Sequence, residues 1–254
     1  MHALLVFAKK EWTEGMRSGK LIMLAAGFIF FGILNPATAK LLPVLLESMA
    51  GSFAEIGMSV SAIQVDAMTS WEQFFKNLPM VLAAFVLVFS NLFSKEYQTG
   101  ALVLLLTRGL PRYVVVVAKA LFLLACWTAG FWLSFGITYA YNSFLWGNTG
   151  FPAAAALPWY GFSLLILCVM VLFSVLQRSS GTVLLETGLF VVLCYLLSLF
   201  PRVKRFSPVF LTESLPVLKE GALLPEYAPA LVISAVIGVV CLAAGTCAMS
   251  RKQL

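Results

Sequence analysis

Few side chains in this sequence could do chemistry. The one histidine is His2. No Ser/His/Asp set, HExxH, GxSxG or phosphate-binding GxxxxGK[ST] motif is present. All five cysteines lie in long apolar runs without a CxxC pair, which favours packing roles over metal ligation or disulfides; they are Cys126, Cys168, Cys194, Cys241 and Cys247. The sequence therefore predicts no catalytic, cofactor-binding or metal site, and an enzyme is disfavoured.

The surrounding composition is that of a membrane protein. Of 254 residues, 61% are hydrophobic and 11% are charged, with a mean hydropathy of +0.96. Apolar runs of about 20 residues match the length of a helix that crosses a hydrocarbon layer about 30 Å thick. The runs lack the two-residue alternation of a membrane barrel. We therefore predict an all-α polytopic membrane protein, with residues 1–254 forming a single transmembrane domain.

Six membrane spans can be read along the chain. They are residues 21–42, 77–93, 113–139, 158–176, 182–200 and 228–249. Pro36 and Pro43 predict that the first helix kinks or ends near them. The fourth and fifth spans are so close in sequence that residues 177–182 must form a tight hairpin.

The predicted spans contain almost no ionisable side chains. Glu186 lies one turn into the fifth span, where a structural contact near the headgroups is favoured over a place inside the bundle. Lys40, late in the first span, is expected to extend toward the headgroups. Because buried charges mark intramembrane chemistry, an intramembrane enzyme and a proton- or sodium-driven transporter are both disfavoured.

The basic residues predict the orientation. With a cytoplasmic N-terminus, eleven of the 17 basic residues face the cytoplasm, and the outer six are Lys40, Lys76, Arg202, Lys204, Arg205 and Lys219. This bias predicts a multi-pass protein of the inner (cytoplasmic) membrane with both termini inside. The basic residues at 202–205 are placed outside, against the positive-inside rule. A fifth span that does not cross the membrane fully would remove this conflict. The net charge of +6 is attributed to lipid headgroups, and no nucleic-acid partner is expected.

Residues 1–20 do not resemble a cleaved signal peptide, because a mixed polar segment precedes a span-length apolar run. Apolar and charged residues alternate there in a way that predicts a helix lying in the headgroup layer. The alternative is a frayed basic leader.

The loop from Ser94 to Lys119 is the most informative segment. It begins with charged residues, passes Gly100, carries the apolar stretch Ala101–Leu106, and turns at residues 108–112. Six apolar residues cannot cross a bilayer. A short helix on the cytoplasmic surface, offering an apolar face to a protein partner, fits this pattern. A basic loop with an incidental apolar patch fits it equally well.

The same loop resembles the coupling motif of type-2 ATP-binding-cassette (ABC) exporter permeases. The matching residues are Lys95, Glu96, Thr99, Gly100, Ala101, Leu102, Leu104, Leu105, Leu106, Thr107, Pro111, Arg112 and Lys119. The amphipathic leader, the six spans and the basic tail also match that family's architecture. Departures are Ala101, where the family often has Thr, Leu110 before the proline, and a tail without the family's usual Phe and acidic residue.

The resemblance implies the permease subunit of an ATP-driven exporter. Two copies of a cytoplasmic ABC-type ATPase would bind ATP and Mg, a second permease copy or paralogue would complete the pathway, and membrane lipid would surround both. The implied ATPase-coupling residues are Glu96, Tyr97, Thr99, Gly100, Arg108, Pro111, Arg112 and Lys119, with a second contact at Gln177 and Arg178. Glu96 would pair with a basic residue. ATP-driven closure would push the surface helix and tilt the second, third and fifth spans.

The sequence also bears on the cargo and on one alternative function. Spans without charge and 21 phenylalanines favour a hydrophobic or amphipathic cargo, such as a lipid, a peptide or a drug-like molecule. Phenylalanines that simply face lipid are the competing explanation. The outer loops, residues 47–76 and 202–227, are long enough to cover an exit. The alternative is an ATPase-docked membrane scaffold, immunity or sensor protein that does not translocate anything.

Overall fold

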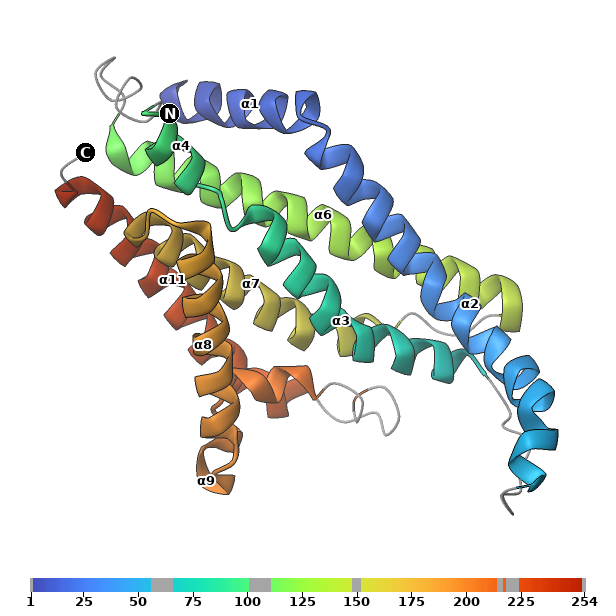
Figure 1. Cartoon of the computed structure of the whole chain (residues 1–254). Helices are drawn as coiled ribbons and strands as arrows, with labels where there is room; N and C mark the ends of the chain where they lie inside the picture. The colour runs from blue at the N-terminus through green and yellow to red at the C-terminus, as the bar shows by residue number, and fades with distance from the viewer. Residues whose placement is uncertain are drawn as a thin grey trace.

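The computed structural model describes residues 2–55, 66–100, 111–147, 152–213, 217 and 224–252, and every regular element in these ranges is helical. In order, the elements are α1 (His2–Arg17), α2 (Lys20–Glu55), α3 (Ala67–Phe89), α4 (Ser94–Thr99), α6 (Arg112–Trp146), α7 (Ala153–Leu176), α8 (Ser180–Ser198), α9 (Pro201–Lys204), η1 (Pro208–Thr212), η2 (Leu224–Tyr227) and α11 (Ala228–Arg251) (Figure 1). Predicted features at residues 56–65, 101–110, 148–151, 214–216 and 218–223 lie outside the described residues.

Six helices of the described chain are long and apolar enough to cross a membrane, which confirms the all-α polytopic membrane fold. Some of these helices are longer than the predicted spans. α3 begins at Ala67 rather than near residue 77, and Asp66 caps it by accepting a hydrogen bond from the Thr69 amide at 2.9 Å. Glu72 and Lys76 interrupt the apolar run but form an ion pair at 3.6 Å on the helix surface. The hydropathy pattern alone therefore missed the first turns of α3.

α2 continues past both of its prolines, so the alternative in which the helix ends there is wrong. A proline at position 36 cannot donate a hydrogen bond to the carbonyl of Gly32. The Thr138 hydroxyl of α6 donates to that carbonyl instead, at 2.9 Å, and Ser134 donates to the Phe28 carbonyl at 2.6 Å. A backbone carbonyl at membrane depth needs such a donor. The α6 hydroxyls thus allow α2 to remain helical.

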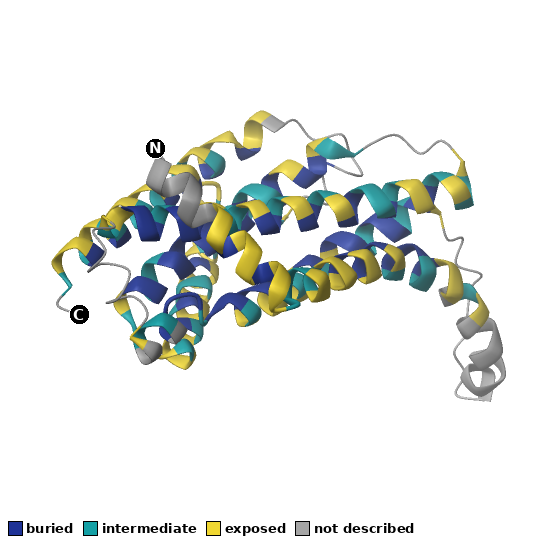
Figure 2. Ribbon diagram, turned by 90° about the horizontal axis from the view of Figure 1, so that it is seen from above, coloured by how far each residue is buried: buried dark blue, intermediate teal, exposed yellow. Residues whose placement is uncertain are grey.

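The interior of the bundle is built from aromatic rings on α2, α3 and α6. Trp71 and Phe135 lie 4.8 Å apart between ring centroids, Phe85 and Trp127 lie 5.0 Å apart, and Phe28 packs on Trp127 at 5.8 Å. Figure 2 shows the buried residues along the inward sides of these helices. Many phenylalanines are therefore packing residues of the core and do not face lipid.

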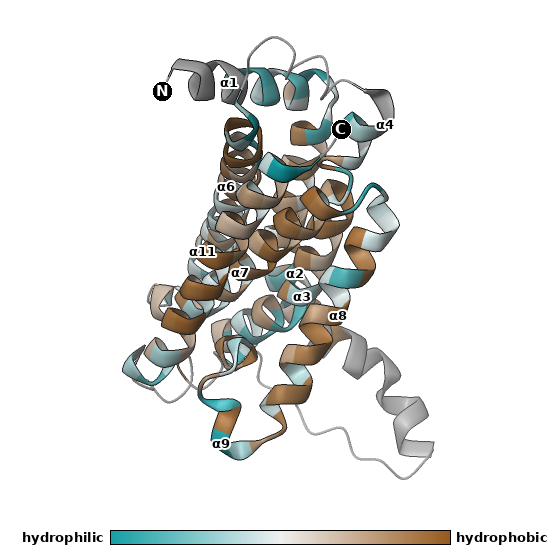
Figure 3. Cartoon of the chain, turned by 90° about the vertical axis from the view of Figure 1, so that its left-hand side faces the viewer, coloured by the Kyte–Doolittle hydropathy of each residue, from teal (hydrophilic) through white to brown (hydrophobic). Residues whose placement is uncertain are grey.

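The two termini and α4 lie at the same end of the bundle, and α1 crosses that end (Figures 1 and 3). α9, with Arg202 and Lys204, lies at the far end of α8. These residues therefore sit opposite the termini, where the orientation analysis places them against the usual charge bias. η1 returns into the bundle beside α7 and α11, with the Leu211 side chain fully buried.

The contact between α2 and α6 depends on a glycine. A Cβ at position 130 would collide with the ring of Phe28, which is held between Phe85 and Trp127. We predict that Gly130→Ala lowers the free energy of unfolding by about 1–3 kcal/mol, because the ring would have to shift from its packing against Phe85 and Trp127. Gly136→Ala on the same helix meets no atom within 4 Å and should be neutral or slightly stabilising. Thermal unfolding in detergent measures both, and equal melting temperatures would contradict the prediction.

Candidate functional site

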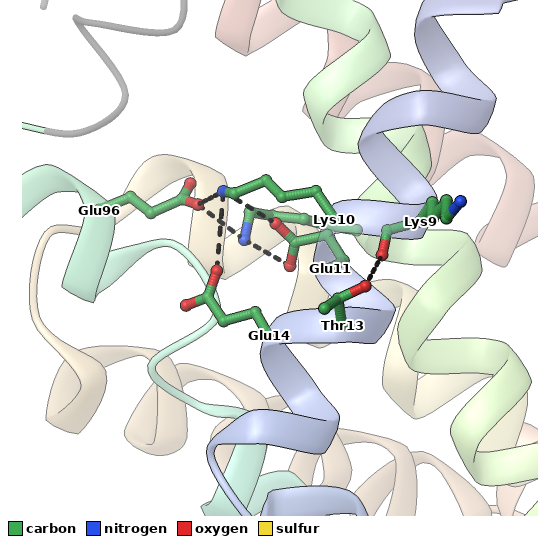
Figure 4. Close-up of polar contacts among 7 residues, drawn as sticks. Lys9, Lys10, Glu11, Thr13, Glu14 and Glu96 are labelled. Atoms are coloured by element: carbon green, nitrogen blue, oxygen red, sulfur yellow. Dashed lines mark hydrogen bonds and ion pairs between the residues drawn. The ribbon is translucent and has the colours of Figure 1, made fainter.

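A buried ion cluster joins three helices at the end of the bundle that carries the termini. Lys119 of α6 is 3% exposed, and its ammonium lies 3.1 Å from Glu11 Oε2 of α1 and 3.1 Å from Glu96 Oε1 of α4. Lys10 lies at the edge of the cluster, 3.6 Å from Glu11 and 3.9 Å from Glu96 (Figure 4). The expected pairing of Glu96 with a basic residue is thus present, and its closest basic partner is Lys119.

The charges of Glu11, Glu96 and Lys119 stabilise one another, because each is largely removed from water. Removing an ion from water costs several kcal/mol, which opposite charges at contact distance offset. Burial raises the pKa of Glu96 above its ordinary value, because the desolvation outweighs the opposing effect of Lys119. The Lys119 ammonium also lies 5.5 Å from the centre of the Phe93 ring. Loss of the Lys119 charge would leave Glu11 and Glu96 without their closest cation.

Tyr97 connects α4 to the opposite side of the bundle. Its hydroxyl donates to the Val175 carbonyl at the end of α7 at 3.0 Å, and it lies 3.7 Å from Met249 Sδ of α11. Burial, with a contribution from Glu96, raises the pKa of Tyr97 to about 12. Tyr97 therefore stays protonated and keeps donating at any physiological pH. The short helix α4 thus contacts α1, α6, α7 and α11 through the side chains of Glu96 and Tyr97.

The chain end completes this junction. Lys252 donates to the carbonyls of Val175 and Leu176 at 2.7 and 3.1 Å, and its ammonium lies 4.2 Å from the centre of the Tyr97 ring. Arg112, the first residue of α6, donates to the carbonyls of Ser250 and Lys252. Burial lowers the pKa of Lys252, and nearby Arg178 adds to this effect. The last turns of α7 and α11 are held to the start of α6.

The structure brings together four of the ten residues that the sequence analysis selected. Glu96, Tyr97, Arg112 and Lys119 belong to the junction. Gly100 ends α4 with a φ of +67°, and Pro111 is the N-cap residue of α6. Thr99 is the last residue of α4, but its side chain, Arg108 and the predicted surface helix at Ala101–Leu106 lie outside the described residues.

The hairpin after α7 contributes a smaller contact. Gln177 donates to Glu186 across the hairpin at 2.5 Å, and Arg178 is exposed. The contact gives Glu186 a structural partner near the beginning of α8, as the sequence analysis favoured. Arg178 remains available at the surface beside Lys252.

Glu11 and Lys10 were missed by the sequence analysis, which treated the first twenty residues only as a headgroup-layer helix. Helical spacing places Glu11 on the same side of α1 as Leu4, Ala8 and Gly15. A lone carboxylate on an apolar helix face has to find a buried partner. That pattern was the available signal for the cluster.

Two cavities lie beside these elements. A small one of about 70 Å³ adjoins the ion cluster and is lined by polar groups of Ser18, Asn91 and Glu96 among others. A larger groove of about 420 Å³ lies between α3, α7 and α8, and none of its lining residues is charged. In the described ranges, no group of three His, Cys, Asp or Glu side chains is placed to hold a metal ion.

Comparison with known proteins agrees with the fold. Over 220 residues the chain is 26% identical to the "Uncharacterized transmembrane protein YxlG" of Bacillus subtilis (strain 168), which covers 82% of this chain and 81% of that protein. No family model and no solved structure matches the chain. Together with the six apolar helices, this similarity supports a multi-pass membrane protein.

Removal of the central cation tests the ion cluster. We predict that Lys119→Met lowers the free energy of unfolding by about 3–5 kcal/mol, because two buried carboxylates are left facing each other. Adding Glu11→Gln and Glu96→Gln to this variant should recover part of the loss, since the uncompensated charge is then gone. Lys40→Met, at an exposed position of α2, should change little. Thermal unfolding measures all three, and no recovery in the triple variant would contradict the electrostatic explanation.

The raised pKa of Glu96 gives stability a pH dependence. The folded chain keeps this proton to a higher pH than the unfolded chain, so it binds more protons above the ordinary value of 4.5. The free energy of unfolding should therefore fall as the pH rises from 4.5 through the raised pKa. Glu96→Gln should flatten this slope, whereas Glu14→Gln, at a side chain 54% exposed, should preserve it. Denaturant unfolding at a series of pH values measures both, and an unchanged slope in Glu96→Gln would contradict the prediction.

Proposed function

We propose that this chain is the membrane-spanning permease subunit of an ATP-driven exporter of the type-2 ABC class. The proposal rests on one observation: α4 contacts α1, α6, α7 and α11 through the side chains of Glu96 and Tyr97. Hydrogen bonds and ion pairs on both sides of one helical turn suit it to pass a displacement to the whole bundle. The resemblance of residues 95–119 to the coupling motif supplies the class of partner.

The position of α4 in the chain suits this role. Residues 101–110 follow Gly100 at the end of α4 and precede Pro111 at the start of α6. A force on that segment therefore enters the bundle through α4 and α6, which are the two elements that share Glu96 and Lys119. An ATPase that binds residues 101–110 on closing would move both helices. The exposed Arg178 hairpin is the second proposed contact.

The orientation and the partners follow from the charge distribution. The end of the bundle with both termini carries Lys9, Arg17, Arg178 and Arg251 as exposed basic side chains. Because eleven of the 17 basic residues are assigned to this side, the positive-inside rule favours an orientation in which this end faces the cytoplasm. Two ATPase subunits bind there with ATP and Mg, and a second copy of the chain or a paralogue completes the pathway.

The apolar groove between α3, α7 and α8 supports a hydrophobic or amphipathic cargo. Its volume of about 420 Å³ is in the range of sites for drug-sized ligands. Two of its three walls, α3 and α8, belong to the helices that the coupling movement would tilt. The cargo is thus a lipid, a hydrophobic peptide or a similar molecule that enters from the membrane.

The test uses the tagged full-length chain purified from its native membrane. We predict that a Walker A-containing ATPase copurifies in stoichiometric amount, and that its ATP hydrolysis in the complex differs several-fold from that of the ATPase alone. Glu96→Gln should shift the rate toward that of the isolated ATPase, because α4 is no longer tied to Lys119. Glu72→Gln, in an ion pair on α3 at the opposite end of the bundle, is the matched control.

Three results would argue against the proposal. A folded chain that purifies without any such ATPase would remove the energy source. An ATPase whose rate is the same free and bound would favour the scaffold or sensor alternative. Equal rates in the complexes of Glu96→Gln and the wild-type chain would show that α4 does not transmit the movement.

A further inference from the structure

The short helix α9 and the residue after it carry a set of cations at the end of the bundle opposite the termini (Figures 1 and 3). Three of the five residues from Pro201 to Arg205 are basic. Lys204 is neutralised, since its ammonium lies 2.9 Å from Glu213 Oε2. The side chains of Arg202 and Arg205 are exposed, and no carboxylate contacts them within the described ranges of the chain. Two arginines are therefore left without an internal counter-ion.

Hydrogen bonds hold this turn in place. Pro201 begins α9, and a proline suits the first helical position because no amide donor is needed there. The Ser207 amide donates to the Val203 carbonyl at 3.1 Å, so the helical turn continues past Lys204. The Ser207 hydroxyl donates to the Cys194 carbonyl of α8 at 3.2 Å. The two arginines are thus presented by a folded turn that is tied to α8.

Helical spacing gives this turn a basic side and an apolar side. Arg202 and Arg205 are three residues apart and therefore share one side. Phe200, Val203 and Phe206 follow one another at the same interval on a neighbouring side, and they are 63%, 41% and 52% exposed. Exposed apolar side chains next to exposed cations are typical of a segment that lies where headgroups meet acyl chains.

The length of α8 places this turn at the surface of the membrane. α8 has 19 residues, which extend about 28 Å along a helix, close to the thickness of the hydrocarbon layer. It follows Leu176, whose carbonyl accepts a hydrogen bond from Lys252 at the terminal end of the bundle. Only 17% of the apolar stretch of α8 is buried inside the bundle. Arg202 and Arg205 therefore lie at headgroup depth, at the end of a helix whose surface is open to lipid.

We propose that Arg202 and Arg205 bind the phosphate of an anionic phospholipid, whose acyl chains lie against the exposed apolar residues of this turn and of α8. The guanidinium group is planar and forms paired hydrogen bonds with phosphate oxygens. A lipid with a net negative charge suits two arginines better than a zwitterionic one, whose own cation they would repel. A symmetric contact with a second copy at this turn would instead bring four arginines together. The inference does not depend on the proposed transport function.

Such a lipid accounts for basic residues at the end of the bundle where the charge bias disfavours them. In the orientation proposed above, this end faces the outer leaflet, and the positive-inside rule predicts few arginines there. The described part of the chain supplies a carboxylate for Lys204 alone among the three cations. A bound phosphate would neutralise the other two. It would also hold the far end of α8, which has little buried surface of its own.

The test measures lipid binding to the full-length chain in non-ionic detergent by native mass spectrometry. Dioleoylphosphatidylglycerol is titrated in parallel with dioleoylphosphatidylcholine, which has the same acyl chains and no net charge. We expect the first phosphatidylglycerol molecule to bind about fivefold more tightly or better. Arg202→Gln and Arg205→Gln should each weaken it about fivefold, as expected for loss of one basic residue near an anionic lipid. Binding of phosphatidylcholine should change much less.

Two controls separate this site from a general effect of charge. The pair Lys9→Gln and Arg251→Gln removes the same charge from exposed positions at the terminal end, and it should leave the first affinity unchanged. Arg202→Lys combined with Arg205→Lys keeps the charge and loses the paired hydrogen bonds. Its affinity for phosphatidylglycerol should lie between those of the wild-type chain and the double Gln variant.

Three results would overturn the inference. The first is equal affinity of the wild-type chain for the two lipids. The second is unchanged phosphatidylglycerol binding in the double Gln variant, and a change from dimer to monomer in that case would show that a second copy contacts this turn. The third is an equal loss of affinity in the control pair at the terminal end. Because both arginines are exposed, melting temperatures near that of the wild type are expected and confirm that each variant is folded.

Discussion

The buried ammonium of Lys119 is the constraint on which the terminal end of this protein depends. A charge that is 3% exposed inside an apolar bundle is stable only where carboxylates reach it, and here they come from α1 and α4. Neither helix is held there by apolar packing alone, since α4 has six residues and α1 lies across the bundle end. Charge therefore adds to apolar packing, such as that of Trp12 on Phe122, in setting the positions of α1 and α4. A change at one member of the cluster must be felt by the other two helices.

The same principle of local compensation explains the membrane-spanning part. Pro36 removes a backbone donor from α2, and Thr138 replaces it from α6. This hydrogen bond requires α2 and α6 to lie close together. Gly130 allows that, because without a Cβ it lets the Phe28 ring lie against α6. Small residues and hydroxyls at helix crossings are a general means of association in membranes, where apolar burial gives little preference between helix and lipid. The aromatic core then fixes the spacing of α2, α3 and α6.

The sequence predicted the helices better than it predicted their contacts. Apolar runs report burial in either lipid or protein, so the six spans were found, but the first turns of α3 were lost because Glu72 and Lys76 interrupt the run. Glu96 and Lys119 were selected by resemblance, and their direct contact follows only from the fold. Glu11 was passed over because a carboxylate among lysines in a leader helix is usually solvated. The helical spacing of its apolar neighbours indicates a buried side of α1, but its partner Lys119 comes from α6, which no local pattern identifies.

The uneven packing of the bundle suggests how a movement at α4 would spread. In the apolar stretch of α7, 67% of the residues are buried inside the bundle, whereas in that of α8 only 17% are. α7 and α11 pack closely along each other and are bound at their ends to Tyr97, Lys252 and Arg112. α8 has few interior contacts to lose, and the 420 Å³ groove separates part of it from α3. In a core packed at crystal-like density, movement is easiest where contacts are fewest. A displacement entering at α4 would thus leave the pair α7 and α11 intact and open or close the groove beside α8, the region where the proposed cargo would bind.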